Sequence, residues 1–247
     1  MTVAALVLGA GSGERLRESL GAGKSERVEG AAAVLPKAFV PLEGRCLLLR
    51  SLEAVAASAE VDLVVPVVAR EAMPRLAGLE SELRKIPKLH PAVAGGEERQ
   101  DSVRCGLEAL PGEVTHVAVH DAARPLVRPE DVSRVVRTAR SCGAALLAIP
   151  VRDTIKRVEA GRVVATPPRS ECYAAQTPQV FRVDWLRDAL AKAEAEGVRG
   201  TDDASLVERL GVTVEVVEGD PANLKITSAE DLALAEQWLR RRGEALQ

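Results

Sequence analysis

VAALVLGAGSGER, residues 3–15, joins a short apolar run to a turn that is rich in glycine. Apolar runs of this length are typical of buried β-strands. Glycines at the end of a strand let phosphate oxygens approach backbone N–H groups, and the fixed charge of Arg15 would offset the charge of the phosphate. The stretch therefore predicts a phosphate-binding turn that follows a first strand.

The turn matches neither of the two best-known phosphate-binding signatures. The dinucleotide fingerprint needs glycine at its sixth position, and this chain has Glu14 there. A P-loop ending in Lys24 and Ser25 needs an earlier glycine where the chain has Glu18. The first mismatch disfavours an NAD-dependent dehydrogenase, and the second excludes a P-loop enzyme.

Apolar strands and amphipathic helices alternate along the rest of the chain, which predicts an α/β fold with a mostly parallel sheet covered by helices on both faces. We expect one domain over residues 1–247, because no linker divides the chain. The expected strands lie at 3–8, 61–68, near Val93, 115–121, 144–151 and 212–217. The expected helices lie at 46–59, 71–86, 99–110, 130–142, 182–196, 202–210 and from Ser228 to about Arg242.

Two segments depart from this alternation. Residues 152–171 read as two strands around Ala160 and Gly161, which predicts a β-hairpin arm standing off the sheet. Residues 16–35 are rich in glycine, alanine, serine and charge with weak periodicity, so we expect an inserted loop. An exposed hairpin commonly needs a partner surface.

Charge and composition favour a small-molecule partner. The formal net charge is −3, from 33 basic and 36 acidic residues, so nucleic acid is not attracted to the chain as a whole. Two Trp, one Tyr and two Phe leave little surface for stacking bases. We therefore expect no nucleic-acid partner.

Cysteine and hydropathy patterns bear on location. The four cysteines lie far apart and three scattered histidines form no cluster, so neither a disulfide framework nor a zinc site is indicated. The chain has no basic leader with a cleavage site and no run of about 18 uncharged apolar residues. We expect a cytoplasmic protein without a membrane partner.

Residues that follow strands should form the site, because ligands of open α/β sheets bind beyond the carboxyl ends of the strands. Asp121 ends one expected strand, with Arg124 three residues further on. Asp121 is the best candidate for a ligand of Mg²⁺ or of a substrate hydroxyl. The alternative is that Asp121 and Arg124 merely pair with each other and cap the next turn.

Taken together, these loops resemble the 2-C-methyl-D-erythritol 4-phosphate cytidylyltransferase (IspD) family over nearly the whole chain. The motifs that carry the resemblance are GAGSGER (9–15), PKAF (36–39), GGEERQDSV (95–103), HDAARP (120–125), PVRDTIKR (150–157), QTPQVF (176–181), TDDAS (201–205) and NLKIT (223–227). The resemblance implies a nucleotidyltransferase-type, Rossmann-like fold. It also implies transfer of CMP from CTP to methylerythritol phosphate with magnesium, in a homodimer whose arm reaches the neighbouring subunit.

The same resemblance assigns roles to individual residues. It makes Arg15, Lys37 and Lys225 the catalytic cations. It gives CTP binding to Ala10, Gly11, Gly13, Gly96, Glu97, Ser102 and Ala122. It gives binding of the sugar-alcohol phosphate to Asp121, Arg124, Thr154, Arg169, Thr177 and Thr201, with Asp121 also the metal ligand.

Three alternatives remain open from the sequence. The gap between Arg15 and Lys37 is much longer than in the family, so Lys24 competes with Lys37, although Lys37 keeps the Pro-Lys-Ala-Phe context. Ribitol or another pentitol 5-phosphate competes as the acceptor. A non-catalytic nucleotide-binding paralogue is the third possibility, and the joint presence of Arg15, Lys37, Asp121 and Lys225 argues against it.

Overall fold

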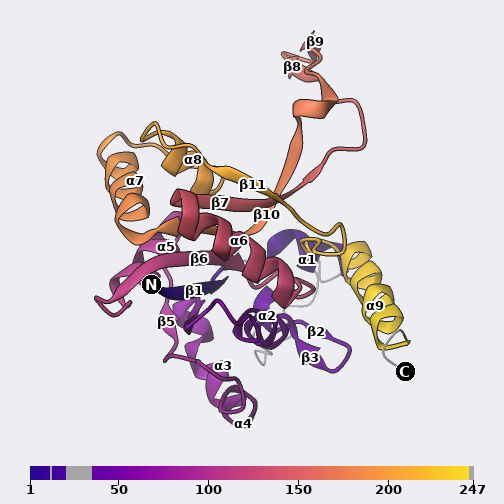
Figure 1. Cartoon of the computed structure of the whole chain (residues 1–247). Helices are drawn as coiled ribbons and strands as arrows, with labels where there is room; N and C mark the ends of the chain where they lie inside the picture. The colour runs from indigo at the N-terminus through magenta and orange to yellow at the C-terminus, as the bar shows by residue number, and fades with distance from the viewer. Residues whose placement is uncertain (12, 21–34, 245–247) are drawn as a thin grey trace.

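A seven-stranded, mostly parallel sheet forms the centre of the molecule in this computed structural model, which describes residues 1–11, 13–20 and 35–244 (Figure 1). The strand order is β11-β7-β10-β6-β1-β4-β5. Only β10 runs antiparallel to its neighbours β6 and β7 in this sheet. The bounds are β1 (Thr2–Gly9), β4 (Leu63–Val68), β5 (Val93–Ala94), β6 (Val114–Asp121), β7 (Ala144–Pro150), β10 (Tyr173–Arg182) and β11 (Glu215–Glu218).

Strand register brings three loops to one edge of the sheet. Leu8 of β1 lies beside Asp121 of β6, and Gly9 lies beside Val68 of β4. Val68 in turn lies beside Ala94 of β5. The segments that follow β1, β5 and β6 therefore start side by side, as expected for parallel strands.

Helices cover both faces of the sheet. Along β1, side chains alternate between the faces, so Val3, Ala5 and Val7 enter one core and Ala4 and Leu6 the other. The first core is closed by α2 (Leu47–Ala56), α3 (Met73–Ala77) and α6 (Pro129–Cys142). The second is closed by α5 (Arg99–Glu108), α7 (Val183–Ala195) and α8 (Asp203–Glu208).

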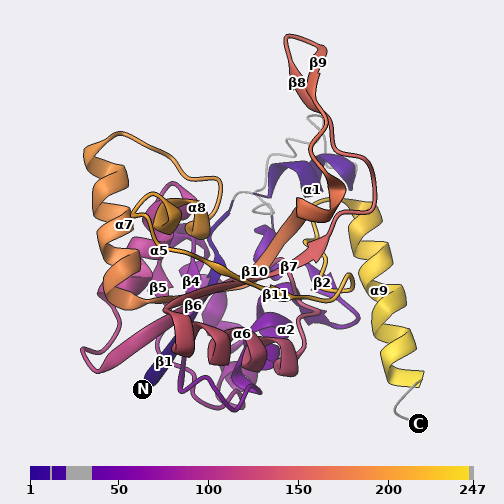
Figure 2. The same cartoon turned by 45° about the horizontal axis from the view of Figure 1, so that its top comes forward.

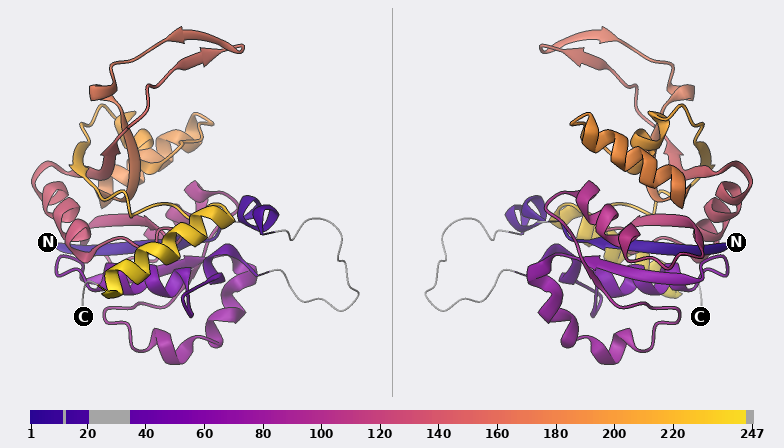
Figure 3. Two further views of the ribbon diagram at one scale, coloured as in Figure 1. Left: turned by 90° about the vertical axis from the view of Figure 1, so that its right-hand side faces the viewer. Right: turned by 90° about the vertical axis from the view of Figure 1, so that its left-hand side faces the viewer.

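A third, smaller core joins α1 (Glu14–Ser19) and β2 (Pro41–Leu42) to the C-terminal helix α9 (Ala229–Glu244). Leu16 of α1, Leu42 of β2 and Ile226 are almost fully buried in it, together with residues of α9. The Ala229 N–H donates to Ser19 Oγ at 2.8 Å. Figure 3 shows α9 along the body of the molecule with α1 next to one end. The short strand β3 (Arg45–Cys46) pairs with β2.

A hairpin arm projects away from the sheet (Figures 1 and 2). Its strands are β8 (Arg157–Glu159) and β9 (Arg162–Ala165). The turn residues Ala160 and Gly161 have φ of 46° and 75°, the left-handed values that two-residue hairpin turns require. The hairpin predicted from the sequence is confirmed.

The predicted α/β fold is confirmed, with three local differences. Strand β10 was not anticipated, because Pro178 interrupts its pattern, and the ladder with β7 accommodates this by a register shift between Ala175 and Gln179. The helix expected at 71–86 is divided into η2 (Arg70–Ala72), α3 and α4 (Glu80–Leu83), because α3 ends at Gly78.

The third difference concerns the expected inserted loop. Helix α1 continues into this segment as far as Ser19, and a short helix η1 (Lys37–Phe39) follows it. Residues 21–34, which include Lys24, lie outside the described residues. Among the helices that are described, none has the length and hydropathy needed to span a bilayer.

Candidate active site

A pocket of about 350 Å³ lies at the carboxyl ends of β1 and β6. Many of the residues singled out from the sequence line it together: Ala10, Gly11, Gly13, Arg15, Lys37, Glu97, Ser102, Asp121, Ala122 and Lys225. They come from segments far apart in the chain. The strand-end rule therefore located the pocket correctly.

Arg15, Lys37 and Lys225 enter this pocket from three different segments. The residue that follows each of them is buried: Leu16 is 1% exposed and Ile226 is fully buried in the third core. Ala38, after Lys37, is 4% exposed in the first core. These anchors fix the backbone of all three cations before any ligand arrives, which is the preorganisation that electrostatic stabilisation needs.

Lys37 lies against the glycine turn. Gly13 has φ of 69°, and a Cβ atom at this position would approach Lys37 Cβ to 2.5 Å. Glycine therefore permits both the left-handed turn and the close approach of the lysine. Burial lowers the pKa of Lys37 to about 8, and the neighbouring charges of Lys225 and Arg15 act in the same direction.

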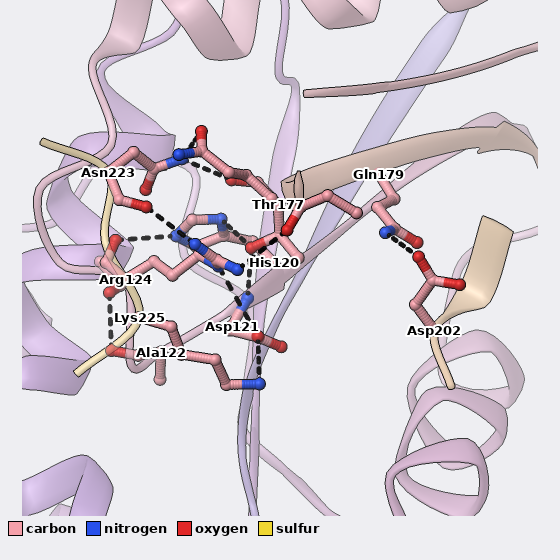
Figure 4. A network of polar contacts seen from close by, with 12 residues as sticks. His120, Asp121, Ala122, Arg124, Thr177, Gln179, Asp202, Asn223 and Lys225 are labelled. Carbon is pink, nitrogen blue, oxygen red and sulfur yellow. Dashed lines mark hydrogen bonds and ion pairs between the residues drawn. The ribbon is translucent and has the colours of Figure 1, made fainter. Parts of the chain in front are cut away.

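Asp121 is the negative centre of the pocket. Lys225 Nζ lies 2.8 Å from its Oδ2, as Figure 4 shows, and Arg99 Nη2 lies 3.4 Å from Oδ1. Burial opposes the charge of Asp121, but Arg99 and Lys225 outweigh it and hold the pKa of this carboxyl well below its usual range. Asp121 is therefore ionised at physiological pH.

A chain of hydrogen bonds fixes the backbone of Asp121 (Figure 4). Its N–H donates to Thr177 Oγ1 at 3.0 Å, and His120 Nδ1 lies 3.0 Å from the same oxygen. His120 Nε2 lies 3.2 Å from the carbonyl oxygen of Arg124. Since a carbonyl only accepts, Nε2 carries the proton and the Thr177 hydroxyl donates to Nδ1. Burial lowers the pKa of His120 to about 4, which keeps this neutral tautomer.

Arg124 supports the loop that carries Lys225. Its Nη1 donates to the carbonyl of Asn223 at 2.8 Å and its Nη2 to that of Ala175 at 3.3 Å. Its Nε lies 3.9 Å from Asp121 Oδ2, whereas Lys225 Nζ lies 2.8 Å from the same oxygen. A simple Asp121–Arg124 pair is therefore not the arrangement that the structure has, and Arg124 and Thr177 lie behind the pocket lining.

Close packing at the start of α5 sets the position of Glu97 and Ser102. A Cβ atom on Gly96 would lie 2.4 Å from Asp101 Cβ, so this position requires glycine. Glu98 and Asp101 form a capping box. Ser102 is 2% exposed and donates to the Glu98 carbonyl at 3.1 Å.

The other predicted binding residues lie outside the pocket lining. Thr154 and Arg169 are exposed on the arm segment, where Arg169 Nη1 donates to the carbonyl of Arg152 at 3.0 Å. Thr201 is exposed at the entry to α8. The roles given to these three residues stay predictions.

Sequence reasoning missed Arg99, the first residue of α5. It lines the pocket and forms ion pairs with both Asp121 and Asp203. The available signal was its position three residues after Gly96, within the GGEERQDSV motif that follows a strand end. That signal marks the loop but does not reveal which carboxylates the arginine meets.

A glycine turn at a strand end, three cations from separate segments and an ionised carboxylate define the pocket of an α/β nucleotidyltransferase. The family model described as "IspD: 2-C-methyl-D-erythritol 4-phosphate cytidylyltransferase" matches residues 3–241. The chain therefore belongs to this family.

Individual relatives agree with this assignment. The 2-C-methyl-D-erythritol 4-phosphate cytidylyltransferase of Geobacter metallireducens is 39% identical over 245 residues, which cover 98% of this chain and 99% of that protein. The crystal structure of the Thermus thermophilus enzyme of the same name has 34% identity and a TM-score of 0.74, covering 97% of this chain and 100% of that one. The 4-diphosphocytidyl-2C-methyl-D-erythritol synthase of Anaerococcus prevotii has 27% identity and a TM-score of 0.80, covering 97% and 98%.

Proposed function

We propose that this protein transfers the CMP group of CTP to 2-C-methyl-D-erythritol 4-phosphate and releases pyrophosphate, as a step of non-mevalonate isoprenoid biosynthesis. The observation that carries the proposal is the convergence of Arg15, Lys37 and Lys225 on one pocket beside the glycine turn. The family assignment supports the identity of both substrates.

The chemistry needs positioned cations rather than a general base. The acceptor phosphate has a second pKa of about 6, so it is already an anionic nucleophile near neutral pH. One of its oxygens attacks the α-phosphorus of CTP, and the bond from this phosphorus to the bridging oxygen of the β-phosphate breaks, so that the electron pair leaves with pyrophosphate. The barrier is repulsion between two polyanions and the charge that develops during transfer. Arg15, Lys37 and Lys225 lower it by electrostatic stabilisation.

CTP and the acceptor would occupy different sides of this pocket. We assign CTP to the turn after β1 and to the start of α5, through Ala10, Gly11, Gly13, Gly96, Glu97, Ser102 and Ala122. We assign the acceptor to Asp121 and Thr201, with Arg124 and Thr177 contacting Asp121. The two substrates are thus assigned to different segments at the edge of the sheet: CTP mainly to those that follow β1 and β5, and the acceptor mainly to the one that begins at Asp121.

The arm supports a homodimer. Val158 and Val163 are 53% and 61% exposed on the hairpin, and neighbouring apolar side chains exposed in this way are typical of an interaction surface. We propose that the arm covers a second copy of the chain, so that Thr154 and Arg169 serve the acceptor site of that copy. This is why neither residue lines the pocket of its own chain.

Asp121 fits a site for Mg²⁺ that is completed by substrate. Magnesium is usually bound by one or two carboxylates together with substrate phosphates. Asp121 is an ionised carboxylate in the pocket lining. Its Oδ2, which now contacts Lys225 Nζ, would bind the metal in place of the lysine. When bound, Mg²⁺ supplies positive charge to the phosphate oxygens of CTP. The described residues hold no cluster of three or more His, Cys, Asp or Glu suited to a metal, so the phosphates would complete the coordination.

We also propose that the enzyme works in the cytoplasm. The cysteines Cys46, Cys105, Cys142 and Cys172 are all free thiols, which suits a reducing compartment.

The proposed function is tested by pyrophosphate release from CTP and Mg²⁺ with each of two acceptors, methylerythritol phosphate and D-ribitol 5-phosphate. We expect rapid release with the first and little with the second, because the relatives are named for methylerythritol phosphate. Release mainly with ribitol phosphate would keep the mechanism but change the acceptor. Absence of release with both would favour a non-catalytic nucleotide-binding protein.

The pH dependence of CTP use follows from Lys37. Below a pKa of about 8 this lysine is protonated in the free enzyme, and above that pKa it loses the charge that attracts the triphosphate. We expect kcat/KM for CTP to be level between the second pKa of the acceptor phosphate, about 6, and the pKa of Lys37, and to fall as pH rises through the latter, approaching about tenfold per unit. The Lys37→Arg variant keeps its charge, so its fall should move to higher pH. Identical profiles for the two enzymes would assign the titration to another group.

A further inference from the structure

Arg99 connects two carboxylates that belong to different parts of the sheet edge. Its Nη1 lies 2.6 Å from Asp203 Oδ2, and its Nη2 lies 3.4 Å from Asp121 Oδ1. The two contacts are unequal, since the first has the length of a strong charge-assisted hydrogen bond and the second is loose. Arg99 is therefore anchored on Asp203 and only approaches Asp121.

Asp203 is a buried carboxylate whose ion pair with Arg99 joins two helices. It is 1% exposed in the first turn of α8, whereas Arg99 begins α5. Burial raises the pKa of Asp203, and Arg99 opposes this shift. Breaking such a pair on one side leaves an uncompensated charge, which is costly in a buried position.

A second tether holds the same loop from the sheet. Gln179 of β10 donates through Nε2 to Asp202 Oδ2 at 2.7 Å, a contact that Figure 4 shows. Its Oε1 accepts the Ala204 N–H at 2.9 Å. The loop that carries Thr201 is thus held from β10 on one side and from α5 on the other.

We propose that Asp203 and Arg99 are a positioning pair for the acceptor site: Asp203 holds the guanidinium back, so that the Asp121 carboxylate stays available to the acceptor. The proposal rests on the function proposed above. Neither residue is assigned contact with the reacting atoms. Arg99 lines the pocket but acts through Asp121, and Asp203 acts through Arg99.

Loss of the Asp203 carboxylate would remove the shorter of the two ion pairs of Arg99. The Arg99 guanidinium would keep its charge, and of its two carboxylate partners only Asp121 would remain. The guanidinium would then close on Asp121 Oδ1 and compete with the acceptor for it. We expect CTP binding to change little, because the side-chain partner of Asp203 in the described structure is Arg99, which is not among the residues assigned to CTP.

The chain contains a matched control. Asp131 is also a buried aspartate, 6% exposed, in the first turn of a helix, and it pairs with Arg134 at the same 2.6 Å. That pair lies on α6 and involves no pocket residue. Asp131→Asn therefore removes the same chemical group without touching the site.

The experiment compares Asp203→Asn with Asp131→Asn in the full-length enzyme, after thermal melts have shown that both are folded. For Asp203→Asn we expect kcat/KM for methylerythritol phosphate to fall by about tenfold, while the dissociation constant for CTP, measured by calorimetry, changes by less than about twofold. Asp131→Asn should leave both values near those of the wild type. Equal acceptor kinetics for the two variants would overturn the proposal.

A second variant separates positioning from general loss of structure. In Asp203→Asn/Arg99→Gln the competing guanidinium is gone, so kcat/KM for the acceptor should recover several-fold over Asp203→Asn alone. A double variant that is no better than the single one would contradict the proposal. This recovery is a non-additive effect that a merely structural pair would not produce.

A crystal structure of Asp203→Asn provides a test that does not depend on turnover. We expect Arg99 Nη2 to move from 3.4 Å to normal hydrogen-bond distance of Asp121 Oδ1, about 2.9 Å. If the guanidinium stays in place or turns to solvent, the proposal fails even in an active enzyme. If the wild type releases pyrophosphate with neither acceptor, the proposed function fails, and the geometry of the variant still decides whether Asp203 restrains Arg99.

Discussion

Lys37→Ala is expected to lower kcat/KM for CTP by about a hundred- to a thousandfold, the range found when a single stabilising donor is removed from a transition state. Lys37 can lie against the turn because Gly13 has no Cβ atom, and the buried Ala38 that follows it fixes its backbone. Its charge is therefore already in place when CTP binds. The loss should appear in steady-state and single-turnover kinetics alike.

Two further lysine variants make this result specific. Lys192 lies on α7 with its Nζ donating to the Arg209 carbonyl at 2.8 Å, away from the pocket lining, so Lys192→Ala should retain nearly full activity. Lys24→Ala tests the competing lysine directly, and it should lower kcat/KM for CTP less than Lys37→Ala does. Near-normal turnover of Lys37→Ala together with a hundredfold loss for Lys24→Ala would transfer the role to Lys24.

Strand-end reasoning predicted the location of the site well because parallel strands leave little freedom there. Once β1 and β6 pair in register, Gly9 and Asp121 must start adjacent loops, whatever the loops contain. Residues named for those loops, such as Arg15, Ser102 and Ala122, accordingly line one pocket. Periodicity and turn chemistry were sufficient for this part of the fold.

The contacts between individual side chains could not be predicted from the sequence in the same way. Arg99 and Asp203 are 104 positions apart in the sequence, so nothing local pairs them. Asp203 lies in the first turn of a helix, where an acid already has an ordinary explanation in the helix dipole. Strand β10 was missed for a related reason, since Pro178 is normally evidence against a central strand. Its register shift next to β7 absorbs the proline, and β10 also supplies Thr177 and Gln179 to the network around the site.

Arg124 and Thr177, which were predicted from the sequence to bind the acceptor, are also part of this network. Each is polar and follows or belongs to a strand near the pocket, and each hydrogen-bonds to other groups of the protein. Thr177 Oγ1 contacts the Asp121 N–H and His120 Nδ1, and Arg124 donates to two backbone carbonyls. Thr177 fixes the N–H of Asp121, and Arg124 fixes the carbonyl of Asn223 two residues before Lys225. Sequence position alone does not separate direct binding from this kind of support.

Mixing two inactive variants is expected to restore activity if the arm serves a second subunit. Lys225→Ala removes a cation from the body of the subunit, and Arg169→Ala removes a cation from its arm; each alone should lose about a hundredfold. In a heterodimer of the two, one site combines an intact body with the intact arm of the other chain. Random pairing of equal amounts in a twofold-symmetric dimer therefore leaves about a quarter of all sites complete.

The geometry of a single chain is what makes this outcome the expected one. The arm projects from the sheet (Figures 1 and 2). Arg169 on the arm segment is exposed, and it donates to the carbonyl of Arg152 rather than to a residue of the pocket lining. This position agrees with the proposal that Arg169 serves the pocket of another copy.

The control for the mixing experiment uses two defects in the same part of the subunit. Lys37→Ala and Lys225→Ala both damage the body, so their heterodimer contains no complete site and should stay inactive. Co-expressed, differently tagged chains allow each heterodimer to be purified and its pyrophosphate release measured. If the Lys225→Ala and Arg169→Ala heterodimer were as inactive as this control, the arm would not act between subunits, and the exposed valines of the hairpin would need a different partner.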